Sequence, residues 1–137
     1  MLNWFERHNS ISFFISLIIA SFIFYISSKP YDPVPTIGFP LKATIYHLGV
    51  FFLLCLFLMI ALSKGKSKDW LFFAIILSFF YGLTDEIHQS FVPGRHTTIR
   101  DIFTNSIGIL FAAIIYYISL EWRKRKAHLK NTNLEQQ

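Results

Sequence analysis

Charged residues are scarce in this chain of 137 residues. Asp, Glu, Lys and Arg make up only 15% of it, whereas 53% of the residues are hydrophobic and 16 are phenylalanine. A soluble domain of this length needs a more strongly charged surface. Long apolar runs with few charges are instead typical of helices that cross a membrane. The composition therefore predicts an all-α membrane protein with one compact bundle and no second domain.

Other chemical signatures are also missing. Cys55 is the single cysteine, so no internal disulfide can form, and its apolar surroundings favour a packing role. No Ser or Cys nucleophile with the usual His and Asp partners is recognisable, which disfavours hydrolysis through a covalent intermediate. The H-E-x-x-H zinc motif is absent as well. We therefore expect no metal and no cofactor.

Four apolar segments organise the chain, and we expect each to be a transmembrane helix. The predicted helices span about 11–27, 44–62, 70–90 and 99–120, within a domain of residues 11–122. The first segment is interpreted as a retained helix, because it lacks a small-x-small cleavage site and its flank carries one Arg beside a Glu. Residues 1–10 form an N-terminal flank, and residues 123–137 form a basic tail.

The basic residues are unevenly distributed, and this predicts the topology. One side of the expected bundle has nine of them: Arg7, Lys64, Lys66, Lys68, Arg123, Lys124, Arg125, Lys126 and Lys130. The other side has four: Lys29, Lys42, Arg95 and Arg100. Cytoplasmic loops are enriched in Lys and Arg, so both termini are predicted to be cytoplasmic. This pattern indicates membrane lipids, and no nucleic acid, as partners of the positive charge.

The stretch TDEIHQSFVPGRHTTIRDIFTN, residues 84–105, gathers acids, histidines and amides between two apolar segments. Residues 70–83 span only about 21 Å as a helix, whereas the hydrocarbon core is about 30 Å thick. The third helix must therefore continue through TDEIHQ, which puts its ionisable residues within the outer leaflet. Such residues are costly in a membrane and by default indicate a functional site.

Helical spacing assigns these residues to faces. Asp85, His88 and Gln89 share one face of the third helix, and Glu86 points about 100° away from Asp85. A matching stripe on the fourth helix consists of Asp101, Thr104, Asn105, Gly108 and Ala112. We expect the two stripes to face each other, because Pro93 and Gly94 predict a turn between the helices.

Each of these residues also has a purely structural interpretation. The two stripes could serve only to join helices by hydrogen bonds. Thr98 and Asp101 match the capping pattern S/T-x-x-D/E, so Asp101 could be a helix cap. His47 could simply bond a neighbouring carbonyl; alternatively, it lies at the depth of His88 and completes the site from a third helix.

The stretch TDEIHQSFVPGRHTTIRDIFTNSIGILFA resembles the signature of the VanZ-like family. That signature contains a D-E-x-H-Q run, a P-G-R turn and a D-x-x-x-N-x-x-G stretch opening the last helix. The matching positions are Asp85, Glu86, His88, Gln89, Pro93, Gly94, Arg95, Asp101, Asn105 and Gly108. Lys42 and His47 resemble the lysine and histidine that begin the family's second helix, although their spacing here is wider. The resemblance covers about residues 10–120.

The resemblance implies a bacterial multi-pass membrane protein whose founding relative is associated with resistance to glycopeptides, especially teicoplanin. The favoured hypothesis is an outward-facing polar pocket, formed by the last two helices, that binds a lipid-linked cell-wall precursor or a glycopeptide. Arg95, with Lys42 or Arg100, would hold a phosphate or carboxylate. The candidate ligand-binding residues are His47, Asp85, Glu86, His88, Gln89, Arg95, Asp101 and Asn105.

Three alternatives stay open. In a membrane enzyme, the catalytic candidates are Asp85, Glu86, His88 and Asp101, with His88 or Glu86 as general base. For a metal site, His47, His88, Asp101 and either Asp85 or Glu86 are acceptable ligands for zinc or manganese, but the E-x-H spacing matches no known two-ligand helix pattern. A transporter or channel is disfavoured, because the polar residues cluster at one end of the helices.

Overall fold

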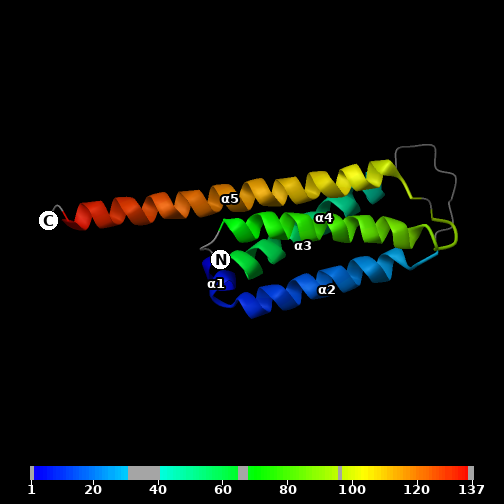
Figure 1. Ribbon diagram of the computed structural model, residues 1–137, viewed down its shortest axis with the longest axis horizontal. Coiled ribbons are helices and arrows are strands. Elements are labelled where there is room, and N and C mark those ends of the chain that lie inside the picture. The colour runs from blue at the N-terminus through cyan, green and yellow to red at the C-terminus, as the bar shows by residue number, and fades with distance from the viewer. Residues whose placement is uncertain (1, 31–40, 65–67, 96, 136–137) are drawn as a thin grey trace.

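The computed structural model describes residues 2–30, 41–64, 68–95 and 97–135, and every regular element in these ranges is an α-helix. The helices are α1 (Leu2–Arg7), α2 (Asn9–Ser27), α3 (Leu41–Ser63), α4 (Asp69–Gln89) and α5 (Ile99–Glu135) (Figure 1). The last four are long and apolar enough to cross a membrane. The predicted fold class, an all-α bundle with four membrane-spanning helices, is confirmed.

The helix α5 continues well beyond the predicted end near residue 120. It extends to Glu135 and projects out of the bundle toward the C-terminus (Figure 1). The residues after Trp122 are mainly good helix formers and include neither Gly nor Pro, so nothing in the local sequence stops the helix. The basic tail, as far as Glu135, is therefore a helical extension of the last span. At the other terminus, the N-terminal flank forms the short helix α1.

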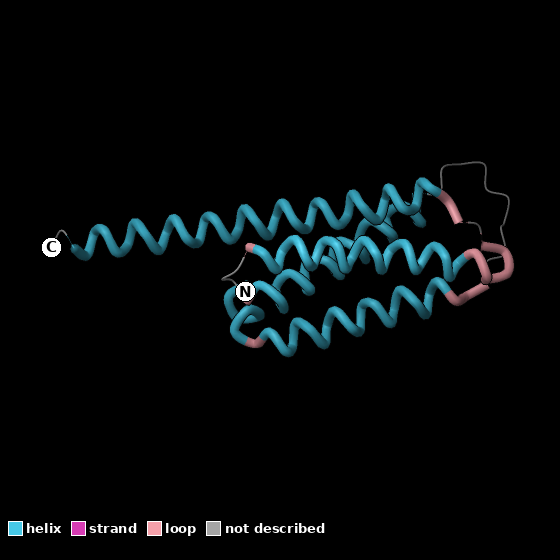
Figure 2. Tube along the Cα trace, viewed as in Figure 1, coloured by secondary structure: helices cyan, strands magenta, loops and turns pink. Residues whose placement is uncertain are grey.

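The helix α3 is the centre of the bundle, and it packs against α1, α2, α4 and α5 (Figure 2). It is apolar around its whole circumference, as expected for a helix that is surrounded by others. Its residues Phe51, Cys55 and Met59 are fully buried and contact the core side chains of the neighbouring helices. Cys55 is thus a packing residue within the core.

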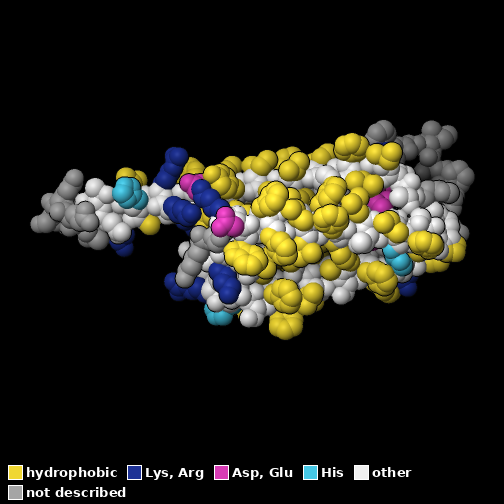
Figure 3. All heavy atoms as spheres, viewed as in Figure 1, with side chains coloured by type: hydrophobic (Ala, Val, Ile, Leu, Met, Phe, Trp, Pro, Cys, Tyr) yellow, Lys and Arg dark blue, Asp and Glu magenta, His cyan; other side chains and the backbone are white. Residues whose placement is uncertain are grey.

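The outer surface of the bundle is apolar (Figure 3). Large side chains such as Phe14, Ile18 and Phe72 are more than 60% exposed, as expected for residues that contact lipid. The Lys and Arg side chains visible in Figure 3 gather mainly at the end of the bundle nearest the C-terminus. An apolar band with charge beyond its edge is the surface that a membrane protein requires.

The four long helices alternate in direction, so the bundle has two chemically different ends (Figure 1). The terminal end holds α1, the α3–α4 connection and the C-terminal half of α5. The motif end holds the C-termini of α2 and α4 and the N-termini of α3 and α5. The polar stretch of residues 84–105 thus lies at the motif end.

Candidate functional site

The connection between α4 and α5 is a tight turn at Pro93 and Gly94. The amide of Arg95 donates to the carbonyl of Val92 at 3.1 Å, and Gly94 has a φ of 77°. Pro at the second position and Gly with positive φ at the third are the features of a type II turn. The turn predicted here is therefore present, and it brings the polar ends of α4 and α5 together.

Arg95 joins this turn to the C-terminus of α2. Its guanidinium donates to the carbonyl of Ile26 at 2.6 Å, to the carbonyl of Lys29 at 3.0 Å and to Oε1 of Gln89 at 3.5 Å. Carbonyls at a helix C-terminus have no partner within the helix, and a basic side chain satisfies them well. The main contacts of Arg95 are thus structural, and its donors face the protein.

The face of α4 that carries Asp85, His88 and Gln89 meets α2. Gln89 donates from Nε2 to Asp85 at 2.8 Å and to Ser27 at 3.3 Å. His88 bonds through Nε2 to the hydroxyl of Ser28 at 2.9 Å. Its ring also stacks on Phe24, with ring centroids 4.5 Å apart.

The polar stripe of α5 packs mainly toward α3. Thr104, Asn105 and Ala112 are buried, and a methyl group added at Gly108 would lie 2.4 Å from the carbonyl oxygen of Leu48. The predicted pairing of the two stripes is present only deeper in the bundle, where a Cβ at Gly82 of α4 would lie 3.5 Å from Nδ2 of Asn105. The hydrogen bonds of His88 and Gln89 go to Ser28 and Ser27 and not to α5. The α4 stripe is turned toward α2, and Glu86, about 100° further around α4, is the residue that approaches α5.

Two members of the α5 stripe, Asn105 and Asp101, bond other side chains. Oδ1 of Asn105 is hydrogen-bonded to Nδ1 of His47 at 3.0 Å in a buried position. Thr98 caps α5: the amide of Asp101 donates to Oγ1 of Thr98 at 3.1 Å, and that hydroxyl donates to Oδ2 of Asp101 at 2.6 Å. Asp101 thus takes part in the cap, which is one of the two interpretations that the sequence left open. His47 thus contributes to the motif end from α3, the second of the four spans.

Glu86 is the least satisfied polar group at the motif end. Its side chain is only 1% exposed, and neither carboxylate oxygen has a hydrogen-bond partner among the described residues. The backbone N–H of Thr98 faces the carboxylate without reaching full hydrogen-bond geometry. One potential ligand atom each of His47, Glu86 and Asp101 lies within 4.8 Å of the others. We call these three residues, together with Asn105, the motif cluster.

Sequence reasoning missed several polar partners at this end. The hydroxyls of Ser27 and Ser28 bond Gln89 and His88, and Arg100 donates to Oγ1 of Thr44 at 3.0 Å. The hydroxyl of Tyr46 is buried without a partner among the described residues. The signals were weak, because short hydroxyl side chains also occur throughout apolar helices. Only the position of Tyr46 beside His47 could have drawn attention to it.

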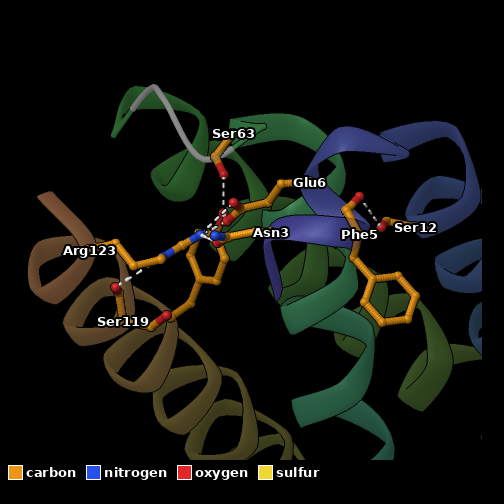
Figure 4. Close-up of polar contacts among 8 residues, drawn as sticks. Asn3, Phe5, Glu6, Ser12, Ser63, Ser119 and Arg123 are labelled. Carbon is orange, nitrogen blue, oxygen red and sulfur yellow. Dashed lines mark hydrogen bonds and ion pairs between the residues drawn. The ribbon is translucent and has the colours of Figure 1, made fainter. Parts of the chain in front are cut away.

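A second polar cluster lies at the terminal end and was also missed (Figure 4). Both oxygens of Glu6 accept hydrogen bonds from Arg123, one of them at 2.7 Å, and Tyr116 donates to Glu6 at 2.7 Å. Tyr116 and Ser63 are joined at 2.6 Å, and Arg123 also donates to Asn3. This terminal cluster ties α1, α3 and α5 together. Each of its acidic oxygens has a partner, which is the pattern of a structural cluster.

Comparison with known proteins identifies the family of the chain. The sequence profile of the VanZ/LLP1 family matches residues 4–120. The chain belongs to this family. The match contains all four spans up to Leu120 and the whole polar stretch, and it confirms the resemblance seen in the sequence. No curated protein and no solved structure matches the chain. The helical extension of α5 beyond residue 120 lies outside the matched range of this VanZ-like protein.

Proposed function

We propose that this VanZ-like protein binds the polar part of an amphipathic cell-envelope molecule at the motif end. The ligand class is a lipid-linked cell-wall precursor or a glycopeptide, and binding contributes to resistance to teicoplanin-type antibiotics. The observation that carries the proposal is the carboxylate of Glu86, which is buried and has no hydrogen-bond partner among the described residues. A carboxylate accepts hydrogen bonds, so it suits the hydroxyl, amide or amine groups of sugars and peptides.

A purely structural role explains Glu86 poorly. Groups that only join helices are hydrogen-bonded across the interface, as His47 and Asn105 are. An acidic residue in a membrane helix costs on the order of 2.5–3.5 kcal/mol at the centre of the span, and pairing offsets such a cost. Glu86 lies one turn from the end of α4 and not at the centre of the span, but no protein partner among the described residues offsets its burial. A bound group at this position would supply the missing partner.

The orientation of the protein in a bacterial membrane is part of the proposal. The terminal end carries Arg7, Lys64, Lys68 and the five basic residues between 123 and 130. Lys66 belongs to the same connection but lies outside the described residues. The four basic residues of the motif end include Arg95, which is bonded to α2. This excess supports a cytoplasmic terminal end and an outward-facing motif end, where envelope precursors are exposed.

The geometry also bears on how an anionic group would be held. Arg95 was the expected anchor for a phosphate or carboxylate, but its donors face the carbonyls of α2. Lys42, at the start of α3, is exposed at the same end of the bundle. We therefore propose Lys42 as the first contact for an anionic headgroup and Glu86 as the contact for hydrogen-bond donors. Arg95 would act by holding the turn in place.

A susceptibility assay tests the proposal. A teicoplanin-sensitive Gram-positive host would express the wild type, Glu86→Gln or the control Glu121→Gln, with membrane levels measured by immunoblot. Glu121 is a carboxylate at the terminal end that pairs with Lys68 at 2.8 Å, and the control makes the same chemical change there. We expect the wild type and Glu121→Gln to protect, and Glu86→Gln to fall to the inhibitory concentration of the empty vector.

Two results would contradict the proposal. If Glu86→Gln is as abundant as the wild type and protects fully, the motif cluster is not the binding site. Absence of protection by every version would remove the resistance role for this chain.

A membrane enzyme is the second candidate. It is favoured by the closeness of the Glu86 and Asp101 carboxylates and the His47 ring, whose potential ligand atoms lie within 4.8 Å of one another. Adjacent acids with an imidazole can donate and accept protons in general acid–base chemistry. In this case reconstituted wild-type protein would convert a labelled lipid-linked precursor to a new product, and Glu86→Gln would not. Binding without product formation supports the first candidate.

A further inference from the structure

Three helices bring a set of metal-ligating side chains to one point in the motif cluster. His47 comes from α3, Glu86 from α4 and Asp101 from α5, and one potential ligand atom of each lies within 4.8 Å of the others. These residues are at least 15 positions apart in the chain, so no short sequence motif identifies them as a set. The convergence is a product of helix packing.

The distances suit a metal ion after small side-chain movements. Atoms no more than 4.8 Å apart have a common centre within about 2.8 Å of each (4.8 Å divided by √3), compared with about 2.0–2.2 Å for zinc bonds to His nitrogen or carboxylate oxygen. Glu86 has no hydrogen bond in the described part of the chain that such a movement would break. Rotation of its side chain can shorten the distances.

The unpaired state of Glu86 is an independent indication of a cation. Its carboxylate is 99% buried, has no hydrogen-bond partner among the described residues and lies beside a second carboxylate. Buried charges in proteins are paired or coordinate metals. The guanidinium of Arg95, a cation of the same turn, donates to the carbonyls of Ile26 and Lys29. A divalent ion would neutralise both acids at once.

The surrounding hydrogen bonds are those that hold metal ligands in place. Nδ1 of His47 bonds Oδ1 of Asn105, which leaves Nε2 as the nitrogen with a free lone pair. Oδ2 of Asp101 accepts from Thr98, which fixes the orientation of that carboxylate. Metal-bound His and carboxylate groups are regularly oriented by such outer partners. His88 does not belong to the set, because it bonds Ser28 and stacks on Phe24.

We propose that His47, Glu86 and Asp101 bind one divalent cation of the zinc or manganese class. One imidazole and two carboxylates are acceptable ligands for both ions. Three protein ligands leave at least one coordination position open, as in catalytic zinc sites. That position can take water or an oxygen atom of a phosphate or hydroxyl group. The site goes beyond the proposed function, because the cation can be present whether or not the protein confers resistance.

Metal analysis of the purified protein tests the site directly. The full chain would be purified in detergent with a tag that contains no histidine, stripped with a chelator, and loaded separately with Zn²⁺ and with Mn²⁺. Elemental analysis after removal of free metal gives the stoichiometry. We expect about one ion per chain for the wild type with at least one of the metals. The matched variants are Glu86→Gln and His47→Gln, with His88→Gln as the control.

The variants locate the ion. Glu86→Gln and His47→Gln should weaken binding at least about tenfold, whereas His88→Gln should bind as the wild type does. The metal should also raise the thermal unfolding temperature of the wild type and of His88→Gln, but not that of Glu86→Gln. This shift is read on folded protein, so it separates lost binding from lost folding. Absence of stoichiometric metal in the wild type, or equal binding by Glu86→Gln, overturns the proposal whatever the susceptibility assay shows.

Discussion

Two buried glutamates, Glu6 and Glu86, have opposite surroundings. The side chain of Glu6 is 8% exposed, and both oxygens accept hydrogen bonds from Arg123, with Tyr116 as a further donor. Glu86 is 1% exposed and has no such partner in the described part of the chain. Glu6, whose role is structural, thus has hydrogen-bond partners for both carboxylate oxygens. The contrast is the reason for assigning ligand or metal binding to Glu86 and a structural role to Glu6.

The partners of Glu6 predict how stability depends on pH. Burial raises the pKa of Glu6, but the hydrogen bonds from Arg123 and Tyr116 and the charge of Arg123 outweigh it, so the pKa lies below its ordinary value of 4.5. A lowered pKa in the folded state means that the carboxylate contributes stability above pH 4.5 and loses this contribution as the pH falls through its folded value. We expect the unfolding temperature in detergent to decrease below about pH 4.5.

The variant Glu6→Gln separates this effect from general acid denaturation. It should be less stable than the wild type at pH 7 and should approach it at low pH, because the wild-type carboxylate is then protonated. Glu121→Gln removes a half-buried acid of a surface ion pair, and its stability should differ little from that of the wild type across this pH range. A constant difference between Glu6→Gln and the wild type from pH 7 down to pH 3 would contradict the assignment.

Residue features set by local geometry were predictable, whereas features set by packing were not. The turn at Pro93 and Gly94 was predicted, and the Thr98–Asp101 cap was one of two interpretations of that pair; both involve residues at most three positions apart, and both are present. The carbonyls that Arg95 bonds, in Ile26 of α2 and in Lys29 just after it, are 69 and 66 positions away. The approach of His47, Glu86 and Asp101 to one another depends on how α3, α4 and α5 are rotated about their axes. A hydrophobicity pattern does not determine these rotations, because α3 is apolar on all sides.

At the scale of the elements, close approach of α5 to α3 positions the motif cluster. Gly108 lies one turn from Asn105, and a Cβ at Gly108 would be 2.4 Å from the carbonyl oxygen of Leu48. Small residues allow membrane helices to approach in this way. The same approach brings Asn105 within reach of His47. The stripe of small and polar residues on α5 was predictable from spacing, but its partner helix was not.

The variant Gly108→Ala should therefore push α5 away from α3. We expect a loss of about 1–3 kcal/mol in stability, the usual cost of overpacking a tight contact. Gly49→Ala is the matched control, since a Cβ there would have no atom within 4 Å. That variant should keep or slightly increase stability, because Ala favours helix by up to about 1 kcal/mol over Gly. Equal stability of the two variants, measured by unfolding in mixed micelles, would contradict the close contact.

At the scale of the whole molecule, the two ends of the bundle differ in their chemistry. The terminal end has basic residues and a polar cluster whose acid is fully paired, whereas the motif end has an acid without a partner among the described residues. An apolar surface separates them (Figure 3). Composition and charge distribution were enough to predict this division. The length of α5 was not predicted, because a polar tail that favours helix has no apolar pattern to mark its end.

The proposed orientation follows from this division and can be measured by cysteine labelling on intact cells. The native Cys55 is fully buried and would be replaced by Ala, and single cysteines would be placed at Ser90 on the motif end and at Lys126 on the terminal end. Both positions are exposed, so access to a membrane-impermeant maleimide depends on the side of the membrane. We expect Ser90→Cys to be labelled in intact cells and Lys126→Cys only after lysis, because basic residues favour the cytoplasmic side. The reverse pattern would direct the motif cluster toward the cytoplasm, and a ligand from the outer leaflet could then not reach Glu86.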